Sequence, residues 1–142
     1  MASSVASYVS IKQQVGNRER VDHTRRAIAA ANSVLSDLQN AETGQRGFHL
    51  TGREAFLEPY RLSLASLPKS LQRAKDLTSD NKMQSRRLDT LTTLVDSRTE
   101  ILANLVAGKR RGEPITVQQL EEGKRYMDGC RAIIQRFIGH EE

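Results

Sequence analysis

KMQSRRLDTLTTLVDSRTEILANLVAGKRR, residues 82–111, carries large apolar side chains three, four or seven positions apart. They are Leu88, Leu91, Val95, Leu102 and Leu105. An α-helix brings residues at these spacings to one face, whereas a half-buried strand needs strict alternation. The stretch therefore predicts a long amphipathic helix whose apolar face must be covered by other helices.

Three other segments, at about residues 4–51, 54–78 and 116–140, repeat this pattern. The first carries Val21, Ile28, Ala31, Leu35 and Leu38. The second carries Leu57, Tyr60, Leu64, Leu67, Leu71 and Ala74. The last carries Leu120, Met127, Cys130, Ile134 and Phe137. Together with residues 82–111, these segments predict four long helices and an all-α fold.

Turn and capping residues separate the four predicted helices. The expected stop signals are Gly52, the polar run at residues 78–81, and Gly112 followed by Pro114. The expected cap pairs, three residues apart, are Thr51 with Glu54, Asn81 with Gln84, and Thr116 with Gln119. Within the second helix we expect a kink near Pro59, and Pro68 should bend the helix or remove a hydrogen bond.

Short connections make successive helices antiparallel, so the sequence predicts an up-down-up-down four-helix bundle. The first helix is nearly twice as long as the others. We therefore divide the chain into a helical stalk, residues 1–20, continuous with the first helix, and a four-helix bundle, residues 21–142.

The apolar side chains of the predicted stalk have no partner within the chain. They are Val5, Val9, Ile11 and Val15. An isolated helix of about 20 residues is only marginally stable in water. We therefore hypothesise that the stalk pairs with a second chain or with a continuing strand of the same stalk. Solution scattering from a compact monomer would contradict this hypothesis.

The charge pattern favours a solvated helical surface over a nucleic-acid interface. The 142 residues include 22 Lys and Arg and 17 Asp and Glu, giving a net charge of +5. Acidic residues lie among the basic ones, and the one dense basic cluster, residues 109–111, falls at a predicted helix end where cations complement the helix dipole. A nucleic-acid interface would need a wider basic stripe, and no apolar run approaches the roughly 20 residues that cross a bilayer.

The sequence contains no recognisable motif for catalysis, for a cofactor or for a metal. His23 and His49 are 26 positions apart, so they lie about 39 Å apart along one helix and cannot share a metal ion. No glycine-rich phosphate loop follows a strand pattern. The single cysteine, Cys130, falls on an apolar stripe and is interpreted as a buried thiol. We therefore predict a non-catalytic domain without a cofactor.

Residues 41–52, AETGQRGFHLTG, interrupt the apolar pattern of the first helix. Continuing its stripe by fours and threes places Glu42, Gln45 and His49 toward the core. Arg46 follows Glu42 by one turn, so the two side chains can form an ion pair. Gly44 and Gly47 each cost about 1 kcal/mol in a helix interior, which close approach of another helix or a ligand would justify.

Two interpretations of these polar residues stay open. In the first, they form a paired network at the bundle tip that fixes the register of the helices, with Gln45 reaching a backbone group or a neighbouring helix. In the second, Gln45, Arg46 and His49 help to form a ligand pocket between helices. Arg98 lies on the core stripe of residues 82–111, and Asp128 is its expected partner in an internal ion pair.

The run at residues 41–52, followed by FLEPY at 56–60, resembles the signature of the third class of CHASE domains, the cyclase- and histidine-kinase-associated sensory extracellular domains. Weaker agreement lies at VDHT (21–24), at LTSDN (77–81), and at Met127 and Asp128 with Arg131. The resemblance covers about residues 21–142. The chain departs from the family pattern at His49, where an aliphatic residue is more usual, and at Lys82, where proline is common.

The resemblance implies a bacterial periplasmic or extracellular sensor domain of an inner-membrane protein, attached through flanking transmembrane helices. The parent protein would carry a cytoplasmic output module, most often a histidine kinase, and would act as a homodimer. Family ligands are poorly defined, so an unknown small molecule or protein is the expected stimulus. A cytosolic helical adaptor or scaffold is the alternative, and apolar runs of about 20 residues on both sides of the domain would exclude it.

Overall fold

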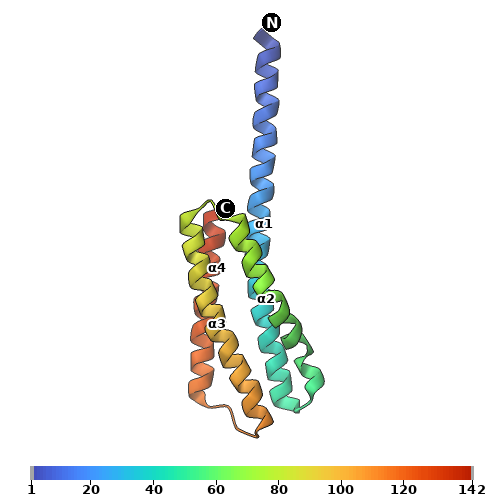
Figure 1. The fold of residues 1–142 in the computed structure, drawn as a ribbon, viewed down its shortest axis with the longest axis vertical. Coiled ribbons are helices and arrows are strands. Elements are labelled where there is room, and N and C mark those ends of the chain that lie inside the picture. Colours follow the sequence, from blue (N-terminus) through green and yellow to red (C-terminus); the bar gives the residue numbers. More distant parts are fainter. Residues whose placement is uncertain (1, 142) are drawn as a thin grey trace.

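The computed structural model describes residues 2–141, with side chains from residue 14 onward. Its elements are α1 (Ala2–Thr51), a short 3₁₀ helix η1 (Glu54–Leu57), α2 (Glu58–Leu77), α3 (Lys82–Arg110) and α4 (Val117–Glu141). Residues 2–141 contain no β-strand. The predicted all-α four-helix bundle is confirmed (Figure 1).

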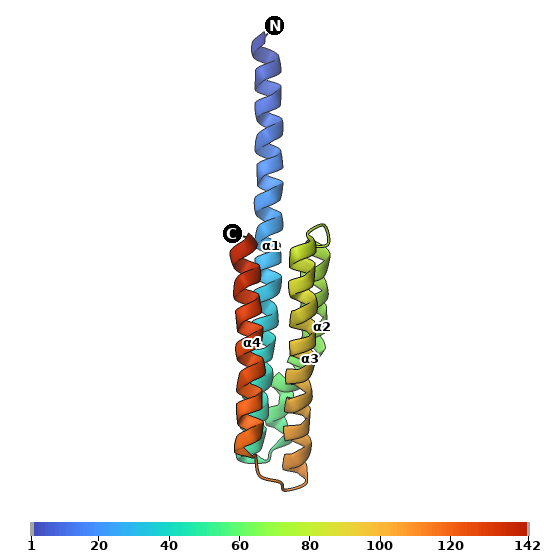
Figure 2. The ribbon, with the colours of Figure 1, turned by 90° about the vertical axis from the view of Figure 1, so that its left-hand side faces the viewer.

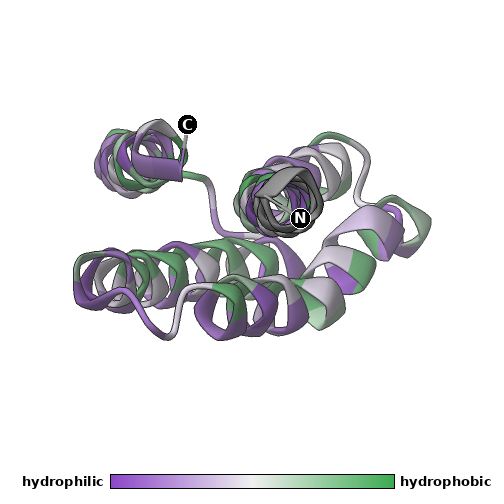
Figure 3. Cartoon of the chain, turned by 90° about the horizontal axis from the view of Figure 1, so that it is seen from above, coloured by the Kyte–Doolittle hydropathy of each residue, from purple (hydrophilic) through white to green (hydrophobic). Residues whose placement is uncertain are grey.

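The bundle consists of two helical hairpins packed side by side. α1 packs most extensively on α2, and α3 packs on α4, while α1 also contacts both α3 and α4. The hairpins run antiparallel, so both ends of the chain lie on the same side of the bundle (Figures 1 and 2). Seen from above, that side shows α4 ending beside the projecting first helix (Figure 3).

α1 continues well past the ends of the other three helices (Figure 2). Val15 and Val21 in this region are about half exposed. The expectation for Val5, Val9 and Ile11 lies outside the residues whose side chains are described. The division into a stalk at 1–20 and a bundle at 21–142 stays a prediction.

The buried face of α1 includes the predicted Ala31, Leu38 and Gln45, and elsewhere it takes the residue one position before the predicted one. A regular four-three spacing runs through Ala27, Ala31, Val34, Leu38, Ala41, Gln45 and Phe48, and Ala30 and Gly44 beside this line are also buried. The predicted Ile28 and Leu35 lie at the flank of this face, and Val21 is exposed. Four alanines of this face, Ala27, Ala30, Ala31 and Ala41, are fully buried, while the larger Ile28 and Leu35 are only partly buried at its edge.

The predicted core faces of α2, α3 and α4 are confirmed except at their margins. α2 buries Leu57 just before its start, then Tyr60, Leu67, Leu71 and Ala74, with Leu64 half-buried. α3 buries all five predicted apolar residues. α4 buries Met127, Cys130, Ile134 and Phe137, but the prediction for Leu120 is wrong, because its side chain is 56% exposed. Leu120 lies in the first turn of α4, where the bundle opens into a cavity.

The first helix connection is built differently from the predicted capping box. Gly52 adopts φ 68° and its N–H donates to the Phe48 carbonyl at 2.7 Å, as expected for a helix-ending glycine. Thr51 is the last residue of α1, and its hydroxyl donates to the Gly47 carbonyl rather than capping a second helix with Glu54. α2 begins only at Glu58, and Pro59 occupies its first turn, where a missing N–H removes no hydrogen bond. A kink at Pro59 is therefore not required.

Of the other two expected cap pairs, Thr116 with Gln119 is confirmed, whereas in the pair Asn81 with Gln84 only the capping by Asn81 is confirmed. Thr116 and Gln119 form a complete capping box, with the side chain of each accepting from the backbone N–H of the other. Asn81 Oδ1 accepts from the N–H groups of Met83 and Gln84. The buried Gln84 side chain does not cap the helix; it donates to the Phe137 carbonyl of α4 at 3.0 Å.

Cys130 should be unreactive in the native chain. It lies on the buried face of α4, and desolvation raises the pKa of its thiol to about 11, although the nearby positive charge of Arg98 opposes the shift. Because the thiolate is the reactive form, a chromogenic disulfide reagent at pH 8 should react roughly 100-fold more slowly than with the urea-unfolded chain. Equal rates in the two states would contradict a buried thiol.

Candidate functional site

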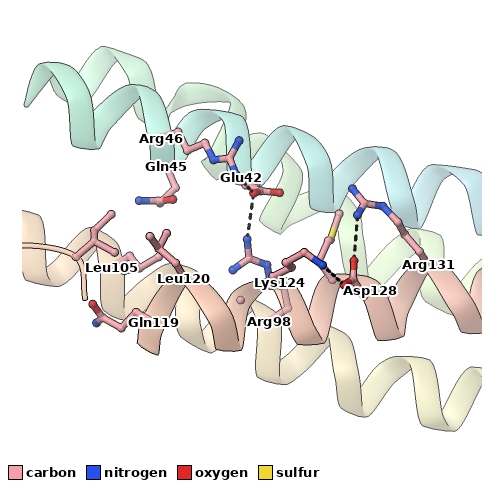
Figure 4. A pocket seen from close by; sticks show the side chains of 13 residues that line it. Glu42, Gln45, Arg46, Arg98, Leu105, Gln119, Leu120, Lys124, Asp128 and Arg131 are labelled. Carbon is pink, nitrogen blue, oxygen red and sulfur yellow. Dashed lines mark hydrogen bonds and ion pairs between the residues drawn. The ribbon is translucent and has the colours of Figure 1, made fainter. Parts of the chain in front are cut away.

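A cavity of about 430 Å³ lies between α1, α3 and α4 near the end of the bundle farthest from the chain ends (Figure 4). Five of the six predicted site residues line it: Glu42, Gln45, Arg46, Arg98 and Asp128. The sixth, His49, is half-buried and does not line the cavity, although its Nδ1 is buried without a hydrogen-bond partner in the described part of the chain. Five of the six positions singled out in the sequence therefore lie around one cavity.

Arg98 is the most deeply buried charged side chain of the site, with 6% of its side chain exposed. Its Nη2 lies 3.6 Å from Glu42 Oε1 on α1, and its Nε is buried without a hydrogen-bond partner among the residues described. Desolvation lowers the pKa of the guanidinium, and the Glu42 charge works against that shift. The side chain thus remains a cation held in a partly desolvated position.

A glycine on α4 makes room for this guanidinium. A Cβ added at Gly123 would lie 2.6 Å from Arg98 Nη1. The α4 backbone can therefore cover the planar group closely, and a larger residue would displace it. This role of Gly123 was not predicted, although a glycine at a position between Leu120 and Met127 on the core stripe of α4 was the available signal.

Glu42 connects two of the basic side chains. Its Oε1 lies 2.7 Å from Arg46 Nη2, one turn along α1, and 3.6 Å from Arg98. The predicted pairing of Glu42 with Arg46 is confirmed. Glu42 is 20% exposed at its side chain, whereas Arg46 is largely in solvent, so the shared carboxylate lies at the boundary between solvent and the buried Arg98.

Gln45 occupies a core position without the partner that was predicted for it. The residue is 4% exposed, and its Nε2 is buried with no hydrogen-bond acceptor within the described residues. Figure 4 shows the amide projecting from α1 toward the side of the cavity occupied by Leu105 and Leu120. The prediction that Gln45 reaches a backbone group or another helix is therefore wrong.

Asp128 pairs with residues of its own helix rather than with Arg98. Its carboxylate lies 2.7 Å from Lys124 Nζ and 3.5 Å from Arg131 Nη1. The hydrogen bond from Lys124 is the main cause that holds the pKa of Asp128 below its usual range. The predicted Arg98–Asp128 pair is wrong, because Asp128 follows the buried Met127 by one position and so faces solvent.

Gly44 and Gly47 lie against the segment that follows α1. A Cβ at Gly44 would lie 2.7 Å from the Tyr60 backbone nitrogen, and one at Gly47 would lie 3.0 Å from the Phe56 ring. The close approach of the Tyr60 backbone therefore requires a glycine at position 44, as the sequence had predicted in general terms, whereas at position 47 the Phe56 side chain would have to shift. This contact lies on the α2 side of α1, away from the cavity.

The cavity combines positive charge with an apolar wall. Four basic side chains and two carboxylates line it, which leaves two positive charges in excess. Its apolar lining residues are Leu105, Ile115, Leu120 and Met127. The sequence had not assigned Ile115, Leu120 or Lys124 to a site, because their convergence depends on how the α3–α4 connection folds back. An arrangement of this kind can bind a small molecule, but it contains no nucleophile paired with a base.

The fold and the cavity together define an all-α four-helix bundle with a pocket between three of its helices. The model of the family described as CHASE3 domain matches residues 17–142, so this chain belongs to the CHASE3 family of extracellular sensory domains found in signalling proteins. No curated protein and no solved structure matches the chain significantly. Across the described residues, none of the helices combines the length and the hydropathy that a bilayer crossing demands.

Proposed function

We propose that this domain is the periplasmic input module of a dimeric inner-membrane sensor histidine kinase. Its first and last helices would pass a stimulus to the cytoplasmic module. The observation that carries the proposal is the position of the cavity: two of its three walls come from α1 and α4, which lead out of the same side of the bundle (Figures 1 and 4). A ligand there would contact both helices at once.

At the end of the bundle nearest the chain ends, hydrogen bonds connect α1 and α4 to the turn between α2 and α3. His23 of α1 bonds through Nε2 to the carbonyl of Leu77, and the Asn81 amide lies 3.0 Å from His140 Nε2 of α4. The α2–α3 turn is thereby tied to both end helices. A small sliding or rotation of α4 against α1 would have to break or exchange these bonds.

The free energy for such a movement must come from unequal affinity of the ligand for two arrangements of the helices. The bundle supplies two hairpins that can shift as units, because α2 packs mainly on α1, and α3 packs on α4. Dimer formation through the projecting part of α1 is supported by the exposure of Val15 and Val21, which find no cover within the described bundle.

Disulfide crosslinking in the full-length protein tests this proposal. Single cysteines would be placed at residues 14–21 of α1 and at 135–141 of α4. The native Cys130 should not form crosslinks, because it is buried. We expect crosslinks between copies at α1 positions with helical periodicity, and a changed pattern between the kinase-on and kinase-off states. Cysteines at the exposed Val117 and Gln118, at the far end of α4, serve as controls.

Identical patterns in the two signalling states would contradict transmission through the end helices, and absence of any α1 crosslink would contradict the dimer. The output module is tested separately, by autophosphorylation of the full-length protein with ATP. Membership in a family of extracellular sensory domains favours this proposal over the cytosolic adaptor or scaffold. Polar flanks in the complete gene product would reverse that preference.

A further inference from the structure

We propose that the cavity between α1, α3 and α4 binds a small organic monocarboxylate, with its carboxylate on Arg98 and Gln45 and its apolar body against Leu105, Ile115 and Leu120. The assignment of this ligand as the stimulus rests on the proposed function. The binding itself does not depend on that function and can be measured on the 142-residue chain.

Unpartnered donors inside the cavity are the first argument. Arg98 Nε and Gln45 Nε2 are both buried and lack acceptors within residues 14–141, and both side chains are more than nine-tenths buried. Buried polar groups are nearly always hydrogen-bonded, because an unmade bond leaves the desolvation penalty uncompensated. A network that served only to fix helix register would be expected to satisfy its own donors. Both residues line the same cavity, so two unpaired donors in its wall indicate a missing acceptor.

The chemistry of the donors selects a carboxylate as that acceptor. A guanidinium presents a planar fork of N–H groups that matches the two oxygens of a carboxylate, and the amide N–H of Gln45 adds a third donor. Glu42 does not fill this role, since its Oε1 is 3.6 Å from Arg98 and is already 2.7 Å from Arg46. Arg98, which lines the cavity, therefore keeps a free N–H at its Nε.

The local charge balance selects a single anionic group. Asp128 is paired with Lys124 and Arg131, and Glu42 with Arg46, so these side chains largely neutralise one another. Arg98 is the buried cation whose own pairing is weakest, at 3.6 Å. One added negative charge completes its environment, whereas a dianion would have to draw the rim cations away from their partners.

The apolar wall argues against an inorganic anion. Leu105, Ile115 and Leu120 line the cavity, and Leu120 keeps 56% of its surface exposed despite lying at a core-type position. Covering this side chain with an apolar ligand body would be favourable at about 25 cal/mol per Å² of buried surface. A volume of about 430 Å³ falls within the range of small-molecule pockets, roughly 300–1,000 Å³.

Calorimetric and NMR titrations of the 142-residue chain with 4-methylpentanoate and 3-phenylpropanoate test the proposal. We expect saturable one-site binding of at least one acid, with resonance shifts at the Gln45 side-chain amide and at Leu120. The neutral 4-methylpentanamide, acetate and inorganic phosphate should bind at least tenfold more weakly, because each lacks either the charge or the apolar body.

Two variants locate the site, and a third provides the control. Arg98→Met and Gln45→Met should each weaken carboxylate binding at least tenfold, while both replace the polar group by an apolar one of similar length. Arg86→Met, on the exposed face of the same helix, should leave binding unchanged. If circular dichroism shows that Arg98→Met does not fold, the binding measured for Gln45→Met decides the proposal.

Failure to bind either acid at millimolar concentration would overturn the proposal. Equal binding of the amide, tighter binding of phosphate, or unchanged binding in both folded variants would also overturn it. These results would leave the crosslinking test of the sensor function unaffected. Conversely, carboxylate binding that leaves the α1 and α4 crosslinks and the kinase activity unaltered would support the site and contradict its role as the stimulus.

Discussion

Replacing Gly44 with alanine should lower the free energy of unfolding by about 2 kcal/mol. The added Cβ would lie 2.7 Å from the Tyr60 backbone nitrogen, 3.0 Å from Tyr60 Cβ and 3.3 Å from the Phe56 carbonyl oxygen. Two of these three atoms belong to the backbone, so the segment after α1 must move as a unit. Overpacking of this kind costs about 3 kcal/mol, and the better helix propensity of alanine returns about 1 kcal/mol.

Urea denaturation followed by circular dichroism measures the effect, and Gly139→Ala is the matched control. Gly139 also lies within a helix, but a Cβ added there meets nothing within 4 Å. That variant should be neutral or more stable by up to about 1 kcal/mol, since only helix propensity changes. Gly44→Ala should therefore lower the free energy of unfolding, and Gly139→Ala should not. A Gly44→Ala variant as stable as the parent would show that the two segments do not approach as closely as the structure indicates.

The close approach at Gly44 illustrates how far the sequence alone could lead. Two glycines within a strong helical pattern indicate that something lies against the helix, and this part of the prediction was confirmed. Their spacing does not say whether the neighbour is a ligand or a backbone. The neighbour is the chain around Phe56 and Tyr60, which arrives there because η1 replaces the expected first turn of the second helix.

The displaced stripe of α1 has a physical cause. Ile28 is larger and more apolar than its neighbour Ala27, and Leu35 is larger than Val34, so a count of hydrophobic residues selects the neighbouring line at these two positions. The structure buries Ala27 and Val34 completely and leaves Ile28 and Leu35 at the flank of the face. The smaller side chains fit between the helices, and the larger ones cover the edge of the interface. Carrying the displaced line forward then reaches His49 instead of the buried Phe48.

The partner of Arg98 depended on information that periodicity does not contain. Heptad spacing places Arg98 on a core face, and its burial confirms this inference. Which neighbour supplies the carboxylate depends on the lateral order and rotation of the helices. The structure brings Glu42 of α1 to the guanidinium and Gly123 of α4 beneath it, whereas Asp128 faces outward.

The Glu42–Arg98 contact should show strong coupling in a double-mutant cycle. Glu42→Gln alone should lower the free energy of unfolding by about 2 kcal/mol, because it leaves a guanidinium with 6% exposure without its counter-charge. This value lies below the range for fully buried pairs, since the distance is 3.6 Å and the Glu42 side chain is 20% exposed. In an Arg98→Met background the same substitution should cost less than about 1 kcal/mol, because only the solvent-exposed pair with Arg46 is lost.

Arg98→Met by itself should be neutral or stabilising, since replacing a buried charge with an apolar side chain of similar size often has that effect. Urea denaturation of the parent, both single variants and the double variant gives a coupling of about 1 to 2 kcal/mol if the contact is as described. Equal costs of Glu42→Gln in the two backgrounds would contradict it. A strongly destabilised Arg98→Met variant would make the guanidinium a structural element of the core. If Arg98→Met instead retains or gains stability while losing carboxylate binding, the buried cation serves the ligand rather than the fold.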